Sequence, residues 1–349
     1  MRVLVAMSGG VDSSVAAATL VSEGHEVVGA TLKLWGGDSD RGCCSVSDVE
    51  DARRVADHLG IAHHTFNFAG AFEEAVVAPY VQDHAAGRTP NPCIECNRHV
   101  KFGVLLERAV RLGFDLLATG HHARIGVEVA GDGRRRLLRG VDRAKDQSYV
   151  LSVLRRPQLE RLSLPIGQMT KAQVRERATR TGLRTASKPD SQEVCFVDSR
   201  AGRAGFLEKR MTLHSGELVD ASTSAVVGTV PAVELVTPGQ RRGLGVAGDG
   251  RRRYALAVDT SARRVLVGDA QAASSLRLDL EALTWVDRPL GIGGRVLTQT
   301  SAHGRPAWCT FEGDSLRFDE PQRLVAPGQT VAFYDPEEPD CVLGAAKAC

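Results

Sequence analysis

The stretch "RVLVAMSGGVDSSVAAATLVSEG", residues 2–24, constrains the fold of this chain more than any other. It joins a continuous apolar run at 2–7 to a helical pattern that ends at Gly24, through a short turn with two glycines. A continuous apolar run is typical of a strand buried on both faces, which occurs in parallel sheets covered by helices. The stretch therefore predicts the first strand–helix unit of an α/β domain.

The same alternation continues through the first part of the chain. Parallel strands need crossover connections, which usually contain a helix and are right-handed. Further strand patterns occur at 26–35, 62–68 and 114–120, with helical patterns at 45–60 and 101–113. We therefore expect an open parallel α/β sheet within residues 1–204.

The pattern of residues along the chain changes after about residue 205. Short β-rich runs separated by Gly, Pro and Asp replace the strand–helix alternation, and this pattern is typical of small barrels or sandwiches. A break near 268–275 separates two such groups of strands. We predict domains at 1–204, 205–272 and 273–349.

Length and composition fit a soluble protein of several domains. A chain of 349 residues exceeds one ordinary core. No run approaches the roughly 18 apolar residues of a membrane span, and the N-terminus does not have the pattern of a signal peptide. We therefore expect a cytoplasmic protein without a membrane partner. Its eight cysteines are too few for a disulfide scaffold, and a cytoplasmic thiol stays reduced unless it takes part in chemistry.

The turn "MSGGVDSS", residues 7–14, is the first candidate binding site. Gly9 and Gly10 allow a tight turn and close backbone approach, and the Asp-Ser-Ser that follows is favoured at a helix N-terminus. Backbone N–H groups and the helix dipole at such a turn form an anion site. The turn matches neither the Walker A nor the G-x-G-x-x-G pattern. Spacing alone leaves two interpretations, a phosphate loop or a plain turn with a serine cap.

Cys93 and Cys96 form a C-x-x-C in "GRTPNPCIECNRHVKF", residues 87–102. Such a pair can bind zinc, exchange disulfides, hold part of an iron–sulfur cluster or carry sulfur as a reagent. Structural zinc needs four ligands, and no second C-x-x-C or H-x-x-x-H is at hand, so zinc is disfavoured. A third cysteine, Cys195, lies far along the chain in "SKPDSQEVCFV". A buried structural thiol is the plain interpretation of any single cysteine.

"SGGVDS" resembles the SGGxDS loop of the ATP pyrophosphatases, or PP-loop enzymes. The wider set "GRTPNPCIECNRHVKF", "ATGHHAR", "LLRGVDRAKDQSYVL", "SKPDSQEVCFV", "TPGQRRGLG" and "PGQTVAFYD" resembles the bacterial tRNA-specific 2-thiouridylases, from the first strand to near the C-terminus. The resemblance implies an N-terminal adenine-nucleotide α hydrolase-like domain with a parallel sheet, a small central β-rich domain and a C-terminal β-barrel.

The resemblance also implies a reaction, the ATP-dependent 2-thiolation of the wobble uridine of tRNA. ATP adenylates the C2 oxygen, so that AMP becomes the leaving group, and Mg²⁺ neutralises the phosphates. Ligands of open α/β sheets sit at the carboxyl ends of the strands. The implied nucleotide-binding residues are Ala6, Met7, Ser8, Gly9, Gly10, Val11, Asp12 and Ser13, with Leu32 and Gly120 at the ends of two further strands.

For the sulfur chemistry, the resemblance implies a persulfide on Cys195, delivered by a cysteine desulfurase or a sulfur-relay protein. Cys96 matches the second catalytic cysteine, which attacks the persulfide and leaves a Cys96–Cys195 disulfide for cellular thiols to reduce. Cys93 departs from the many relatives that carry an acid/base Asp there. A [4Fe–4S] cluster on Cys93, Cys96 and Cys195, with one iron open to carry sulfur, uses the same residues, and both mechanisms stay open. No other metal site is predicted.

The partner implied by the resemblance is the anticodon arm of tRNA. The contacts carried over are Asn91, Pro92 and Cys93 at the target base, and His121, Lys145, Asp146, Gln147 and Gln329 elsewhere. Arg241 and Arg242 are suited to grip phosphates, whereas the plain interpretation of Asp146 is a helix cap. Ser301 and Ala302 stand where relatives often have an Arg-Tyr pair, so that contact is not carried over. The rival functions are another ATP pyrophosphatase, such as an amide-forming synthetase, and a non-catalytic RNA-binding protein.

Overall fold

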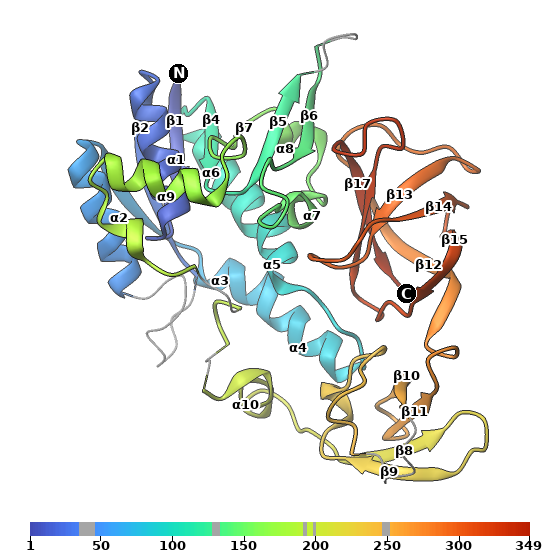
Figure 1. Ribbon diagram of the computed structural model, residues 1–349. Helices are drawn as coiled ribbons and strands as arrows, with labels where there is room; N and C mark the ends of the chain where they lie inside the picture. The colour runs from blue at the N-terminus through green and yellow to red at the C-terminus, as the bar shows by residue number, and fades with distance from the viewer. Residues whose placement is uncertain (35–45, 128–132, 191–193, 198–199, 246–251) are drawn as a thin grey trace.

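The computed structural model describes residues 1–34, 46–127, 133–190, 194–197, 200–245 and 252–349. Figure 1 shows three parts: an α/β part, a small β part that carries β8–β11, and a barrel beside the α/β part. Within the described residues, no helix is long and apolar enough to cross a membrane.

The α/β part is built on a five-stranded sheet in the order β3-β2-β1-β4-β7, and every neighbouring pair is parallel. Its strands are β1 (Arg2–Ala6), β2 (Glu26–Lys33), β3 (Ala62–Asn67), β4 (Leu116–Thr119) and β7 (Leu162–Ser163). Both faces of the sheet are covered, which explains the continuous apolar pattern of the first strand. Val3 and Val5 belong to one buried cluster and Leu4 to another. The predicted open parallel sheet is confirmed.

Two sets of helices cover the sheet. The face of Val3 and Val5 packs against α1 (Val11–Ser22), α2 (Val46–Leu59) and α9 (Lys171–Arg180). The other face packs against α3 (Ala69–Phe72), η1 (Glu73–Val77), α4 (Ala78–Ala85), α5 (Pro92–Glu95), η2 (Cys96–Leu105) and α6 (Leu106–Arg111). The helix expected at 101–113 begins earlier, at Pro92, and is π-wound from Cys96 to Leu105. Asn91 caps this earlier start and proline stands at the first helical position, where its missing N–H does no harm.

Shorter elements connect the sheet to the rest of the chain. An antiparallel hairpin of β5 (Ala123–Val127) and β6 (Arg135–Arg139) follows β4. The remaining connections are α7 (Ser148–Leu151), α8 (Arg156–Leu159), η3 (Arg184–Ser187) and α10 (Gly202–Glu208).

Two β parts complete the fold. The central sheet has the order β10-β11-β8-β9, formed by β8 (Gly216–Asp220), β9 (Val226–Val230), β10 (Tyr254–Asp259) and β11 (Arg264–Gly268), with η4 (Val233–Leu235). The closed barrel runs β12 (Ser274–Trp285), β15 (Ser315–Arg323), β14 (Ala307–Phe311), β13 (Arg295–Gln299), β16 (Thr330–Tyr334) and β17 (Val342–Ala348). The predicted fold class is confirmed, while the boundaries at residues 205 and 273 remain predictions.

The barrel docks on the α/β part through buried tyrosines. The Tyr149 hydroxyl of α7 donates to the Thr330 carbonyl at 2.8 Å, and the Tyr334 hydroxyl lies 3.1 Å from Ser148 Oγ. Burial raises the pKa of Tyr334 to about 12 and that of Tyr149 further, so both hydroxyls stay protonated. These contacts fix the position of the barrel relative to α7.

Replacing Tyr149 by Phe should therefore weaken this docking. Tyr149→Phe removes one buried hydrogen bond, and we expect the free energy of unfolding to fall by about 1 kcal/mol in chemical denaturation. Tyr254→Phe is the matched control, because no described residue is a hydrogen-bond partner of the Tyr254 hydroxyl. An unchanged stability of Tyr149→Phe would contradict the docking role.

Candidate active site

The turn between β1 and α1 is shaped by glycine. Gly9 has φ +72°, and a Cβ atom there would lie 2.2 Å from the Asp48 carbonyl oxygen. Gly10 is the N-cap residue of α1, and the side chains of Ser13 and Ser14 turn back to donate to its carbonyl at 3.1 and 2.8 Å. Among the described residues, no side chain accepts from the N–H groups of Val11, Asp12 or Ser13. The serine-cap interpretation is therefore wrong, and the first turn presents its N–H groups as an anion site does.

The other predicted nucleotide residues surround this turn. Met7 continues β1 by donating its N–H to the Ala30 carbonyl at 2.8 Å, and the Thr31 hydroxyl donates to the Met7 carbonyl at 2.8 Å. Leu32 lies near the end of the neighbouring strand β2 and is buried. Ala6 ends β1. The structure thus brings these residues to the carboxyl edge of the sheet, as expected for adjacent parallel strands.

Asp12, in the first turn of α1, is held between two residues from distant parts of the chain. Lys171 Nζ lies 2.7 Å from both carboxylate oxygens, and His122 Nε2 lies 3.1 Å from Oδ1. Burial alone would raise the pKa of Asp12, but the hydrogen bonds with His122 and Lys171 outweigh it, and the pKa lies below its ordinary value. Asp12 is therefore a carboxylate at neutral pH. Sequence reasoning did not single out Lys171, because it stands in an ordinary helix first turn.

The end of β4 lies against the same turn. A Cβ atom on Gly120 would lie 2.5 Å from the Ser13 backbone nitrogen, so only glycine permits this approach. The next residue, His121, is 8% exposed, and the Thr119 hydroxyl lies 2.7 Å from its Nδ1. Burial, with smaller effects of Lys101 and His122, lowers the pKa of His121 well below its ordinary value. This predicted tRNA contact is therefore a neutral, buried side chain.

The segment Lys145–Gln147 joins this edge of the sheet. The side chain of Asp146 is 7% exposed and accepts hydrogen bonds from Gly140 N, Ser148 N, Ser148 Oγ and Arg139 at 2.8–3.0 Å. Gln147 Oε1 accepts from His122 N at 2.8 Å. Lys145 is 38% exposed and pairs with Asp190 at 2.9 Å. Of the three predicted contacts, Lys145 presents the most accessible charge. Gln147, not Asp146, is the N-cap residue of α7, so the cap interpretation of Asp146 is wrong, although its carboxylate accepts from the N–H of the first helical residue.

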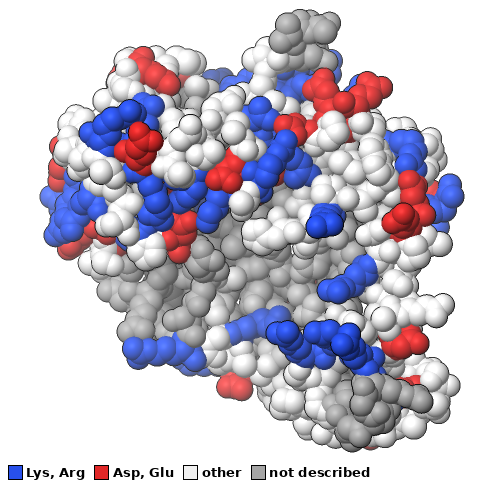
Figure 2. Space-filling view, in the orientation of Figure 1, with Lys and Arg blue, Asp and Glu red and all other residues white. Residues whose placement is uncertain are grey.

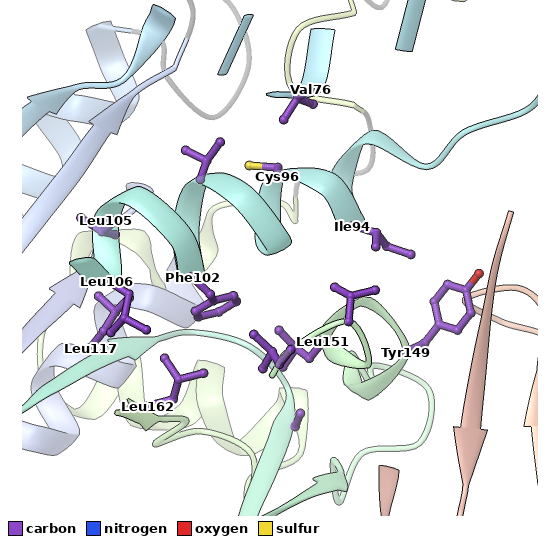
Figure 3. Packing of buried hydrophobic residues seen from close by; sticks show 14 of the residues in the cluster. Val76, Ile94, Cys96, Phe102, Leu105, Leu106, Leu117, Tyr149, Leu151 and Leu162 are labelled. Carbon is purple, nitrogen blue, oxygen red and sulfur yellow. The ribbon is translucent and has the colours of Figure 1, made fainter. Parts of the chain in front are cut away.

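The C-x-x-C pair begins the long helix of α5 and η2. Asn91 Oδ1 accepts from Cys93 N at 3.1 Å, which fixes the first turn behind Pro92. Cys93 is exposed, whereas Cys96 is 6% exposed and starts the π-wound segment. Figure 3 shows Val76 beside Cys96, with Phe102 farther along the same helix. π-Wound turns are frequent at functional sites.

Glu95 anchors this helix to the barrel. It pairs with Lys347 at 3.0 Å, Arg98 at 3.2 Å and His99 at 3.3 Å. Burial would raise the pKa of Glu95, but His99, Arg98 and Lys347 lower it to about 2. The carboxylate is therefore ionised at any physiological pH. Because Glu95 lies between Cys93 and Cys96 in the sequence, its ion pairs hold the helix at that point.

Cys195 lies in the short described segment 194–197. It is partly buried against the cluster that contains Cys96. Its neighbour Phe196 anchors the segment, with ring centroids 5.6 Å from Phe72, 5.4 Å from Tyr80 and 5.0 Å from Phe206.

The described cysteines are not joined to one another by disulfide bonds. None of the six described cysteines forms a disulfide, so the predicted Cys96–Cys195 bond is absent from this state. In the described part of the chain, no three His, Cys, Asp or Glu side chains are arranged to hold a metal ion. Cys93, Cys96 and Cys195 therefore form no preassembled three-ligand site for a [4Fe–4S] cluster in this arrangement, and no step is derived through one.

The barrel and the central part reach the segment that precedes Cys93. Gln329 donates its side-chain amide to the Thr89 carbonyl, and Thr89 N donates to Pro327 O at 2.8 Å. The Thr89 hydroxyl lies 3.3 Å from that of Thr237. Nearby, a hollow of about 400 Å³ is lined by Gly239, Gln240, Arg241, Arg242, Tyr254 and Arg323. Figure 2 shows Lys and Arg side chains gathered around the hollowed face of the molecule.

The fold and the loop define a class, an ATP pyrophosphatase-type α/β domain followed by a small β domain and a β-barrel. Three domain families match the chain. They are described as "tRNA methyl transferase HUP domain" over residues 1–199, "tRNA methyl transferase PRC-barrel domain" over 204–269, and "Aminomethyltransferase beta-barrel domain" over 278–347.

Curated relatives match the whole chain. A protein of Saccharopolyspora erythraea, named tRNA-specific 2-thiouridylase MnmA, is 46% identical over 99% of this chain and 98% of its own length. The protein of the same name from Salinispora arenicola is 46% identical with the same coverage. The solved structure of a predicted tRNA methyltransferase subunit from Methanocaldococcus jannaschii covers 51% of this chain and 76% of its own, at 20% identity. Its TM-score of 0.33 is too low to support a conclusion about this chain.

The chain belongs to the tRNA-specific 2-thiouridylase family of the PP-loop superfamily. The domain descriptions name methyl or aminomethyl transfer, whereas the names of the relatives refer to the thiolation of uridine. The relatives decide the family, because they match the chain from end to end.

The contact between Gly120 and the first turn of α1 can be tested directly. Gly120→Ala forces a Cβ atom into backbone at 2.5 Å, and we expect the free energy of unfolding to fall by about 1–3 kcal/mol in chemical denaturation. Gly70→Ala is the matched control, since nothing lies within 4 Å of the added atom and its helix favours Ala. Equal stability of the two variants would refute the close approach.

Proposed function

We propose that the protein catalyses the ATP-dependent 2-thiolation of the wobble uridine of tRNA, in the cytoplasm. The observation that carries the proposal is that Cys96 belongs to one apolar cluster and Cys195 packs against the same cluster, in the part of the chain that also holds the phosphate-type loop. Cys96 and Cys195 lie 99 residues apart in sequence and contact the same cluster. An amide-forming synthetase or a non-catalytic RNA binder has no need of this pair.

The activation step uses the turn at Gly9 and Gly10. Its N–H groups and the α1 dipole bind the pyrophosphate of ATP, and Lys171 adds positive charge at the same place. Mg²⁺ in nucleotide sites is typically held by one or two carboxylates plus phosphate oxygens, and the ionised Asp12 fits that demand. When bound, Mg²⁺ supplies neutralisation of the phosphate charge. The C2 oxygen of the uridine attacks the α-phosphorus, pyrophosphate leaves, and the base carries an AMP leaving group.

The sulfur step uses Cys195 and Cys96. Cys195 carries a persulfide received from a cysteine desulfurase or a relay protein. The Cys96 thiolate attacks Cys195 Sγ, the persulfide S–S bond breaks, and hydrosulfide leaves as the Cys96–Cys195 disulfide forms. Hydrosulfide then attacks C2, and AMP departs with the original oxygen. Two external thiols then reduce the Cys96–Cys195 disulfide, restore both cysteines and leave as a disulfide themselves.

We favour this persulfide route over a [4Fe–4S] route on geometric grounds. Cys93 is exposed and Cys96 is buried on one helix, and the described residues gather no group of three metal-binding side chains. Cys93 therefore receives no chemical step, and its place beside Asn91 suits contact with the target base.

The tRNA is held by contacts spread over all three parts. Lys145 and the arginines Arg241, Arg242 and Arg323 of the hollow suit phosphates, which position an RNA without reading its sequence. Gln329, through Thr89, orients the segment Asn91–Cys93 toward the target base. His121 is buried, so its role is to support the end of β4 next to the loop and not to contact the tRNA directly.

The two cysteines give the sharpest test of this function. We expect Cys96→Ser and Cys195→Ser each to lower tRNA thiolation on the order of a hundredfold or more, because hydroxyls cannot form a persulfide or attack one. Pyrophosphate release in the presence of tRNA should remain, since the proposed activation step uses neither thiol. Thiolation is measured by mass spectrometry of digested tRNA.

Cys349→Ser is the matched control, because Cys349 is exposed, follows the barrel strand β17 and takes no part in the proposed steps. It should thiolate tRNA as the unaltered protein does. Normal thiolation by either Cys96→Ser or Cys195→Ser would sink the assignment.

A further inference from the structure

Asp190 forms ion pairs with three basic side chains, Lys145, Lys171 and Arg175. We propose that Asp190 is a positioning residue that couples the nucleotide loop and the tRNA-contacting Lys145 to the segment that carries Cys195. The proposal rests on the proposed function. Asp190 itself touches neither thiol, and its role is to hold other groups.

The carboxylate of Asp190 meets three cations. Oδ1 accepts from Arg175 at 2.8 Å and lies 2.9 Å from Lys171 Nζ, and Oδ2 accepts from Lys145 at 2.9 Å. Lys145 precedes α7, whereas Lys171 and Arg175 stand on α9. One side chain therefore ties two elements that are far apart in sequence to the chain five residues before Cys195.

Lys171 carries the connection to the nucleotide loop. Its Nζ lies 2.7 Å from both oxygens of Asp12 while it pairs with Asp190. The side chain is 12% exposed, so these contacts form away from bulk water and are screened less than surface pairs. The series Asp12, Lys171, Asp190, Lys145 thus runs from the phosphate loop to the proposed tRNA contact.

The backbone that leads to Asp190 is held by the same elements. Lys188 Nζ donates to the Gly9 carbonyl at 3.0 Å and pairs with Asp48 and Asp51 on α2 at 2.6 and 2.8 Å. Arg175 donates to the carbonyls of Ala186 and Lys188 at 2.8 and 3.0 Å. These contacts hold the backbone that leads to Asp190, and beyond Cys195 the ring of Phe196 packs against Phe72, Tyr80 and Phe206.

A carboxylate is required at this position. Arg175, Lys171 and Lys145 bring three positive charges within 3 Å of it, and a neutral amide would leave their mutual repulsion uncompensated. Lys171 would keep both contacts with Asp12, so the nucleotide loop would remain intact. Lys145 and the Cys195 segment would lose their shared anchor, so the sulfur step should suffer more than activation.

Asp190→Asn tests this split. We expect single-turnover thiolation to fall about 10- to 100-fold, the usual effect of removing a residue that orients reacting groups. At saturating tRNA, which compensates for a weakened Lys145 contact, we expect tRNA-dependent pyrophosphate release to stay within about threefold of the unaltered protein. Asp190→Glu, which keeps the charge, should recover part of the thiolation. Asp319→Asn, which breaks an exposed barrel ion pair with Arg295, is the matched control and should change neither rate.

Two outcomes would overturn the proposal. One is thiolation by Asp190→Asn at the unaltered rate. The other is an equal fall of pyrophosphate release and thiolation together with a lowered Tm, which is the sign of a general scaffold role. If Asp190→Asn does not fold, Arg175→Gln removes one arm of the same junction and should show the same split. Absence of thiolation in the unaltered protein would instead defeat the proposed function.

Discussion

The contact on which the rest of the site depends is the pairing of Asp12 with Lys171 and His122. It joins the first turn of α1 to α9 and to the end of β4, and it keeps the carboxylate ionised against the effect of burial. Because His122 is in turn bonded to Gln147, the same contact sets the position of the segment that begins with Lys145. The nucleotide side and the proposed tRNA side of the site are therefore parts of one polar network.

A second constraint comes from the barrel, which holds the helix of Cys93 and Cys96 in place. Glu95 pairs with Lys347 on β17, and the Thr89 segment is bonded to the turn at Pro327 and Gln329. The parts beyond the sheet thus contribute to the site without supplying its thiols. The barrel therefore supports the helix of Cys93 and Cys96 and the segment that precedes it.

Much of this could be predicted from local pattern. Buried strands, helix periodicity and the glycine turn depend on neighbouring residues, so the parallel sheet and the loop were predictable. The partners of Asp12 were not, because Lys171 lies 159 residues away and its helix shows no unusual feature. The burial of His121 and the hydrogen bonds that occupy the Asp146 carboxylate likewise depend on how the surrounding segments pack. The helix of Cys96 begins early because Asn91 caps it. The two prolines in this stretch of sequence favoured a loop and so hid the start of the helix.

The central claim is that one site activates a tRNA uridine with ATP and then delivers sulfur from a cysteine. The most direct measurement is reconstitution with purified protein, unmodified tRNA, Mg²⁺–ATP and a cysteine desulfurase supplied with cysteine. Mass spectrometry of the digested tRNA should then show 2-thiouridine, with pyrophosphate released in equal amount and neither product formed without ATP. Thiolation that proceeds without ATP, or pyrophosphate release without thiolated tRNA in the complete mixture, would contradict the account.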